Sequence, residues 1–116
     1  MNHKQEEYIR YRRERALQSL QAAKNNLENG LLHEAVSRSY YACFYAVTAL
    51  LVTRDLYSSK HRGVRAFFDE HFVKKGLFSR EMSRFYHRLF DSRKEADYNV
   101  NLPIFEGMVK SFKTMK

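Results

Sequence analysis

The sequence predicts an all-α protein: an antiparallel up-and-down four-helix bundle with an additional short helix. Helix-forming residues dominate the chain, and its 116 residues include only one Pro and four Gly. No run alternates polar and apolar residues as a half-buried strand would. Hydrophobic residues make up 44% and aromatic residues 15% of the chain, which is enough to fill one core. Because this length suits one domain, we expect residues 1–116 to form a single helical domain.

The first helix is expected from about Gln5 to Asn29, because apolar residues recur there at helical spacing. Asn29 and Gly30 supply its stop, and Leu31 stands where a Schellman motif makes its apolar contact. The helix also carries an arginine cluster that neighbouring glutamates partly offset. We interpret this cluster as a solvated face rather than a binding arm. Its members are Arg10, Arg12, Arg13 and Arg15.

The second helix, about Leu32 to Arg54, is predicted to be central because it is apolar nearly all round. Residues 37–39 are too polar for a membrane span, which needs about 20 mostly apolar residues. One stripe holds only small residues and lets another helix approach closely: Ala35, Ser39, Ala42, Ala46 and Ala49. Another stripe indicates a buried or half-buried polar seam, within the fold or at a subunit contact: Arg38, Tyr41, Tyr45, Thr48 and Val52.

The third helix is expected from about Lys60 to Lys75, with Ser58 or Ser59 as its N-terminal cap and Gly76 at its end. It opens on a run of positive side chains, which is unfavourable for the helix dipole. A bound anion would relieve this repulsion, and we keep Lys60 and Arg62 as candidate ligand-binding residues. The alternative is that both side chains simply point into water. A fourth helix, about 80–98, and a last helix from near residue 103 complete the prediction.

Composition narrows the classes of function. The net charge of +8 favours RNA, nucleotides or an acidic protein as partner, although such a charge also keeps a small domain soluble. The chain has no HExxH motif, Cys/His ligand cluster, GxSxG motif or glycine-rich phosphate loop, so we predict no metal and no cofactor. The lone Cys43 indicates a reducing compartment. Residues 1–15 lack a secretory apolar core, so we expect a cytoplasmic protein without membrane contact.

Four segments of the chain resemble motifs of small prokaryotic HEPN-domain proteins. RSYYA at 38–42 is similar to their R-x-Y-Y-A, and KHRGV at 60–64 is similar to their HKGV segment. HFVKKG at 71–76 resembles HFVKTG, and RKEADY at 93–98 resembles R-x-E-A-D-Y. The order and spacing of all four agree, and together they cover about residues 5–116.

The resemblance implies a helical bundle that pairs into a homodimer and a partnership with a small nucleotidyltransferase, often as a toxin–antitoxin pair. The wealth of apolar surface on the second helix also favours two-fold pairing. Many HEPN proteins are metal-independent ribonucleases that use an Arg followed, after four to six residues, by a His. The Arg position maps onto Arg93, but residues 98–100 are Tyr, Asn and Val where the His should stand. Three other pairs fit this spacing outside the matching region, and we regard them as coincidences: Arg54/His61, Arg65/His71 and Arg80/His87.

Metal-free RNA cleavage needs a base for the 2′-hydroxyl proton and a group that stabilises charge on phosphorus. Arg93 could supply the second. Without the motif His, the first role falls to Asp97 or Tyr98, or no group supplies it. The alternative is that Arg93 and Asp97 form a structural network with Arg38 and Tyr41. The candidate ligand-binding residues are Arg38, Tyr41, Tyr45, Lys60, Arg62 and Arg93.

Three readings of function therefore remain open. The first is a module that binds nucleotide or RNA and pairs with a nucleotidyltransferase. The second is an active ribonuclease toxin that uses Arg93 with Asp97 or Tyr98. The third is a helical adaptor without a role on nucleic acid.

Overall fold

The computed structural model describes residues 1–92, and it contains helices and no strand in that part of the chain. The elements are α1 (His3–Glu28), α2 (Leu32–Val52), α3 (His61–Phe68), a π-helical turn η1 (Asp69–Val73) and α4 (Arg80–Ser92). The prediction of an all-α protein is confirmed. The predicted end of the fourth helix beyond Ser92 and the helix expected from Pro103 lie outside the described residues.

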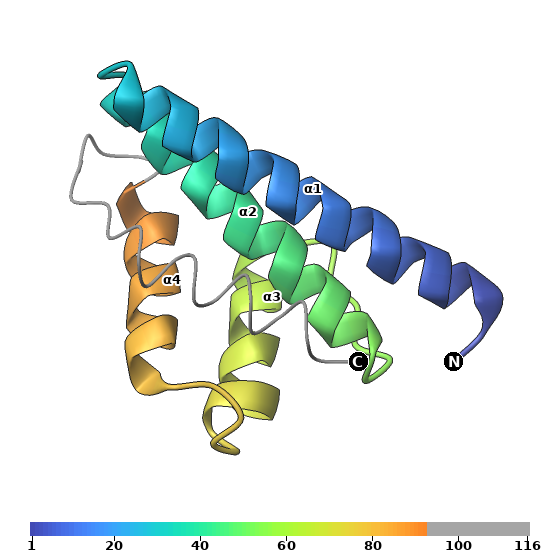
Figure 1. Ribbon diagram of the computed structural model, residues 1–116. Coiled ribbons are helices and arrows are strands. Elements are labelled where there is room, and N and C mark those ends of the chain that lie inside the picture. Colours follow the sequence, from blue (N-terminus) through green and yellow to red (C-terminus); the bar gives the residue numbers. More distant parts are fainter. Residues whose placement is uncertain (93–116) are drawn as a thin grey trace.

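Helix α2 is the element that the other helices pack against. Figure 1 shows α1 and α2 side by side as a long antiparallel hairpin, with the shorter α3 and α4 on the other side of α2. Helix α2 contacts α1, α3 and α4. The predicted central helix is therefore confirmed, and its end at Val52 lies two residues before the predicted one.

The small-residue stripe of α2 is fully covered, as predicted. Its five residues are all buried, and α1 contributes buried small residues of its own. Two of these, Ala16 and Ala23, are 1% and 0% exposed. Small side chains on both partners let the two helix backbones approach closely, because little volume separates them. Farther along the same seam, Ile9 packs with Ala49 and Val52.

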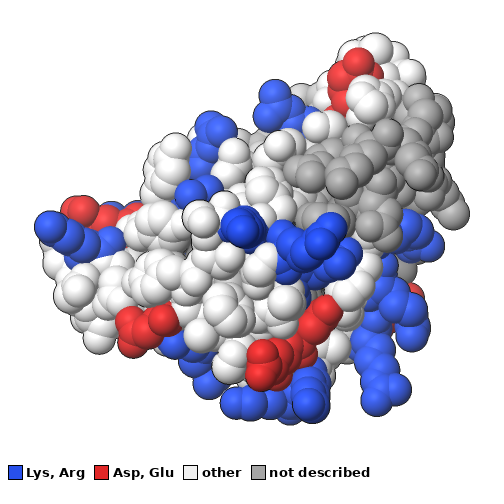
Figure 2. All heavy atoms as spheres, turned by 180° about the vertical axis from the view of Figure 1, so that it is seen from behind, with Lys and Arg blue, Asp and Glu red and all other residues white. Residues whose placement is uncertain are grey.

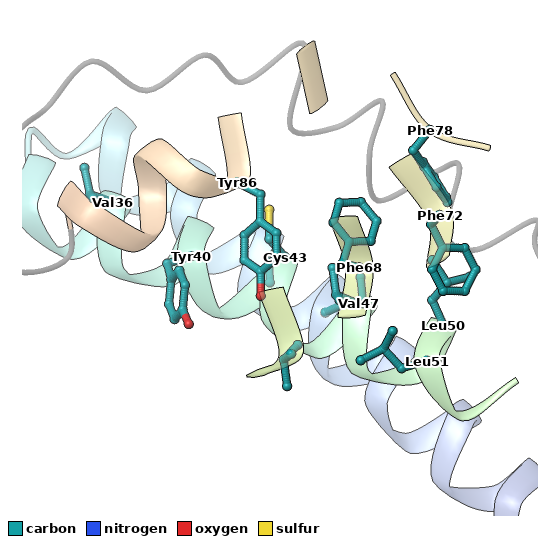
Figure 3. Packing of buried hydrophobic residues seen from close by; sticks show 14 residues of the cluster. Val36, Tyr40, Cys43, Val47, Leu50, Leu51, Phe68, Phe72, Phe78 and Tyr86 are labelled. Atoms are coloured by element: carbon teal, nitrogen blue, oxygen red, sulfur yellow. The ribbon is translucent and has the colours of Figure 1, made fainter. Parts of the chain in front are cut away.

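The opposite side of α2 forms the main core (Figure 3). There, Tyr40, Cys43 and Val47 of α2 lie in one cluster with aromatic residues from the other elements. These are Phe68 of α3, Phe72 of η1, Phe78 of the following loop and Tyr86 of α4. The sequence thus places its large aromatic side chains on one side of α2 and its small ones on the other.

Local hydrogen bonds define both ends of α1. It begins two residues earlier than predicted because Asn2 and Gln5 form a capping box, in which each side chain accepts the other residue's backbone N–H at 2.9 and 3.0 Å. At the other end Gly30 has φ +72°, and the Leu31 N–H donates to the Asn26 carbonyl at 2.8 Å. This is the predicted Schellman motif. The Leu31 side chain stays 48% exposed, so the hydrogen bonds rather than an apolar contact form this stop.

The prediction of a serine cap on the third helix is wrong. The N-cap residue is Lys60, and no side chain caps the helix. Ser58 instead accepts the Lys60 N–H at 3.2 Å, before the helix begins. A Cβ added at Gly63 would overlap the Ser58 hydroxyl, so a larger residue there would force the Ser58 side chain to move.

The third helix ends through a π-helical turn rather than as a regular α-helix. The helix is α-helical only to Phe68, and η1 carries it to Val73. Gly76 then has φ +79°, and Phe78 is buried against the aromatic core. The predicted stop at Gly76 is confirmed. Leu77, which follows it, stays 45% exposed.

Helix α2 is long and apolar enough, by length and composition, to cross a membrane. The apolar window of this helix is nevertheless 72% buried inside the fold. Such burial is typical of the central helix of a bundle, which is apolar on several sides because other helices cover it.

Cys43 should not react with thiol reagents in the native state. The side chain is fully buried, and burial raises the pKa of the Cys43 thiol far above its ordinary value. Because the thiolate is the reactive species, labelling with an aromatic disulfide reagent should follow unfolding and reach completion in denaturant. Rapid labelling of the folded protein would contradict the placement of this α2 face in the core.

Candidate nucleic-acid interface

The predicted seam of α2 is buried or half-buried except at its first residue. Tyr41 and Tyr45 are half-buried, and Thr48 and Val52 are buried. Arg38 is exposed, so the prediction is wrong for that residue. The predicted catalytic residues Arg93, Asp97 and Tyr98 lie outside the described residues, as does the expected contact between this seam and the end of the fourth helix.

Two arginines of α1 meet the seam at Tyr45. The guanidinium carbons of Arg12 and Arg15 each lie 5.3 Å from the centre of the Tyr45 ring. Arg10 is exposed, as expected for a solvated face, but Arg12 and Arg15 are half-buried. The interpretation of the arginine cluster as solvated is therefore wrong in part. Arg13 is half-buried as well, and the Tyr45 ring from α2 contacts both Arg12 and Arg15.

The contact continues along α1 to Tyr8, whose ring centre lies 4.9 Å from the Arg12 guanidinium carbon. Tyr8, Arg12 and Arg15 share one face of α1, since their spacing of four and three residues matches the helical repeat. We call the four side chains of Tyr8, Arg12, Arg15 and Tyr45 the arginine–tyrosine row. Each guanidinium in the row is therefore next to at least one aromatic face, an arrangement that attracts cations through the ring quadrupole.

The positive charge of the row is not neutralised within the described chain. Among residues 1–92, no carboxylate forms an ion pair with Arg12 or Arg15. The Nε of Arg12 is buried and has no hydrogen-bond partner there. Arg15 donates a long hydrogen bond of 3.4 Å to the Tyr45 hydroxyl, and this bond raises the pKa of Arg15 above its ordinary value. Both arginines thus keep a full charge and unused donors, which is the arrangement that an anionic ligand requires.

An aromatic cluster joins the row to the start of α3. The Tyr41 ring lies 6.1 Å from the Tyr45 ring and 6.3 Å from the His61 ring, centre to centre. His61 stacks on Phe44 at 4.2 Å, and its Nδ1 lies 2.6 Å from the Tyr40 hydroxyl. These contacts hold the first residue of α3 against α2. The flanking candidates Lys60 and Arg62 are exposed, so this end of the surface adds two further cations.

A Ser, a His and an Asp come together between η1 and α4, which their sequence order did not predict. Asp69 accepts from the Ser83 hydroxyl at 2.7 Å and from His87 Nε2 at 2.5 Å. The Ser83 hydroxyl lies 3.5 Å from the same His87 nitrogen. A nucleophilic triad needs the serine and the carboxylate on opposite ring nitrogens. This cluster is therefore a hydrogen-bonded clamp between η1 and α4, and His87 does not activate Ser83.

The described residues offer no metal centre. Within residues 1–92, no group of three or more His, Cys, Asp and Glu side chains is arranged to hold a metal ion. The candidates that remain in this part of the molecule include the arginines and tyrosines of the row and the cations at the start of α3.

Removing the hydroxyl group from two buried tyrosines should change the free energy of unfolding in opposite directions. Tyr40→Phe removes the hydrogen bond between the Tyr40 hydroxyl and His61 Nδ1 and should lower the free energy of unfolding by about 0.5–1.5 kcal/mol, the net contribution of one hydrogen bond. Within residues 1–92 the buried Tyr86 hydroxyl has no hydrogen-bond partner, and burial raises the pKa of Tyr86 well above its ordinary value. Tyr86→Phe should therefore raise the free energy of unfolding by about 1 kcal/mol. Urea denaturation measures both changes, and a loss of stability in Tyr86→Phe would contradict the unpaired state of that hydroxyl.

Comparison with known proteins gives one consistent result. The model of the HEPN domain family matches residues 9–112. A UPF0332 protein of Thermotoga maritima is 46% identical over 112 residues, which are 97% of this chain and 84% of that protein. A protein of Methanocaldococcus jannaschii named "Putative toxin" is 38% identical over 91 residues, or 78% of this chain and 68% of its own. A second protein of that organism, also named as a putative toxin, is 34% identical over 102 residues. These residues are 83% of this chain and 69% of that protein.

Proposed function

The chain belongs to the HEPN domain family, and on that premise we propose that it binds single-stranded RNA or a nucleotide through the arginine–tyrosine row. We further propose that it does so as a homodimer in the cytoplasm, paired with a small nucleotidyltransferase in a module of the toxin–antitoxin type. The toxin name of two relatives supports a module of this type. The observation that carries the binding proposal is the unneutralised charge of Arg12 and Arg15 beside aromatic rings.

The chemistry of the row fits single-stranded nucleic acid. Proteins that bind such strands combine cationic side chains that follow the phosphates with aromatic rings on which the bases stack. Arg12 and Arg15 supply guanidinium groups, which match phosphate oxygens in pairs and stay charged. Tyr41 and Tyr45 are half-buried, so part of each ring remains open to solvent. A base can reach these faces only when it is unstacked, which favours single strands over duplexes.

The wider charge distribution supports the same class of ligand. Lys and Arg side chains are spread over the face shown in Figure 2, and they outnumber the Asp and Glu side chains visible there. The chain as a whole carries a net charge of +8. A positive surface attracts polyanions over about a Debye length, while the row supplies the close contacts.

Arg15→Ala should weaken RNA binding by about 10- to 100-fold in Kd, the range for a hydrogen bond to a charged group. Fluorescence anisotropy with a labelled, unstructured RNA oligonucleotide measures the effect at several salt concentrations. Arg15→Lys should recover only part of the loss, because a lysine lacks the planar fork of donors. The slope of log Kd against log salt should become shallower in Arg15→Ala, because one phosphate contact is lost.

Arg10→Ala is the matched control for that experiment. It removes the same charge from the same helix, but Arg10 is exposed and lines a different cavity, of about 600 Å³, in which Glu6 and Glu14 offset the positive charge. Equal losses in Arg10→Ala and Arg15→Ala would reduce the binding to net charge and remove the basis for a site. Absence of binding in the unchanged protein, at low salt, would overturn the proposed function.

The same samples test the ribonuclease alternative. The integrity of the RNA after incubation with the protein, in the presence of a chelator, reports any metal-independent cleavage. Arg93→Ala should abolish cleavage if Arg93 stabilises the charge on phosphorus. Binding without cleavage leaves the proposed function intact.

A further inference from the structure

We propose that the cavity between the start of α1 and the loop that joins α2 to α3 binds a single nucleobase. This inference rests on the proposed function, because it places the base of a bound strand or nucleotide next to the arginine–tyrosine row. The cavity has a volume of about 340 Å³, within the range of small-molecule sites, roughly 300–1,000 Å³. Its lining includes Tyr8, Leu51, Val52, Tyr57 and Val64.

The cavity has an apolar floor and an aromatic rim. Leu51, Val52 and Val64 are at most 3% exposed, so they form its floor. Tyr8 is half-buried, and Tyr57 is 58% exposed, so both rings lie nearer the opening. A planar ring that enters such a cavity buries its faces against apolar and aromatic groups, which is the favourable arrangement for a nucleobase.

The polar groups of the cavity are mostly occupied. The Thr48 hydroxyl donates to the Tyr45 carbonyl at 2.8 Å. The Ser58 hydroxyl exchanges hydrogen bonds of 3.2 Å with the backbone of Lys60. The Ser59 and Tyr8 hydroxyls, which also line the cavity, are the side-chain groups that remain to contact the edge of a base. The cavity should therefore recognise the face of the ring and discriminate little among the four bases.

The aromatic rim is held in place before any ligand arrives. Gln5 Nε2 donates to the Tyr57 hydroxyl at 3.0 Å and to Asp55 at 2.6 Å. The same Gln5 uses its side-chain oxygen in the capping box of α1, so its position is fixed by the helix. Asp55 stands at φ +56°, in the left-handed region that is uncommon for residues other than glycine. Because the aromatic rim is already ordered, its side chains lose little conformational entropy when a ligand binds, and this favours affinity.

The cavity and the row are joined by one residue. Tyr8 lines the cavity and also lies 4.9 Å from the Arg12 guanidinium carbon. A base in the cavity would therefore place its phosphate near Arg12, whose buried Nε has no partner among the described residues. A second cavity of about 260 Å³ shares Tyr8, Val52 and Tyr57 and extends to Lys4. Cations thus stand on both sides of the proposed base site, as a strand with a phosphate on each side of the base requires.

The first test follows adenosine 5′-monophosphate on the full chain by NMR. The nucleotide should shift the methyl signals of Leu51, Val52 and Val64, while inorganic phosphate at the same concentration should shift only signals near Arg12 and Arg15. If the nucleotide shifts no more signals than phosphate does, the cavity is not a base site and the inference is overturned. This measurement needs no substitution, so it does not depend on the folding of a variant.

The second test separates this inference from the proposed function. Tyr57→Ala should weaken binding of the RNA oligonucleotide by about tenfold, the loss expected for one stacked base. Tyr57→Phe keeps the ring and should retain most of the affinity. Tyr11→Ala is the control: it removes a tyrosine of nearly equal exposure, 57%, that does not line the cavity, and it should leave binding of the mononucleotide unchanged.

Failure of the base-site inference can be distinguished from failure of the proposed RNA binding. If Tyr57→Ala binds RNA like the unchanged protein while Arg15→Ala is weakened, the base site is overturned and the proposed function stands. If neither substitution weakens binding, both are overturned. Equal weakening of mononucleotide binding in Tyr11→Ala and Tyr57→Ala would also count against the cavity.

Discussion

The close packing of α1 on the small-residue stripe of α2 is the contact on which the rest of the structure depends. Ala16 and Ala23 of α1 and Ala42 and Ala46 of α2 are all at most 2% exposed. Because alanine side chains are only methyl groups, the two backbones can approach closely, and longer side chains at the edge of the seam then come into contact across it. Tyr45 consequently meets Arg12 and Arg15. The charged surface is thus a direct result of how the core is packed.

The arrangement of charge on that surface is unusual for a purely structural role. Guanidinium groups that only stabilise a fold normally pair with carboxylates, because an unpaired, partly buried cation loses hydration. The chain keeps Arg12 and Arg15 beside tyrosine rings, which compensate only part of that loss. A ligand phosphate would supply the rest.

The Asp69–Ser83–His87 cluster shows that residue types alone do not define chemistry. All three side chains of a nucleophilic triad are present and within hydrogen-bond distance. Asp69 and Ser83 nevertheless lie on the same nitrogen of His87, so the imidazole cannot take the serine proton while the carboxylate holds its other side. The cluster instead joins η1 to α4, and this contact holds Tyr86 in the core beside Phe68.

The sequence by itself determined the helices, the central place of α2, the stops at Gly30 and Gly76, and the family. These features depend on helical periodicity and on backbone conformations set within a few residues. Only the tertiary structure decided that Arg12 and Arg15 meet Tyr45, that Gln5 holds Tyr57, and that no serine caps α3. The first two contacts join residues 30 and 52 positions apart, and they depend on how closely and at what register two helices pack. Periodicity in one helix carries no information about that register, because it fixes which face is buried but not what it meets.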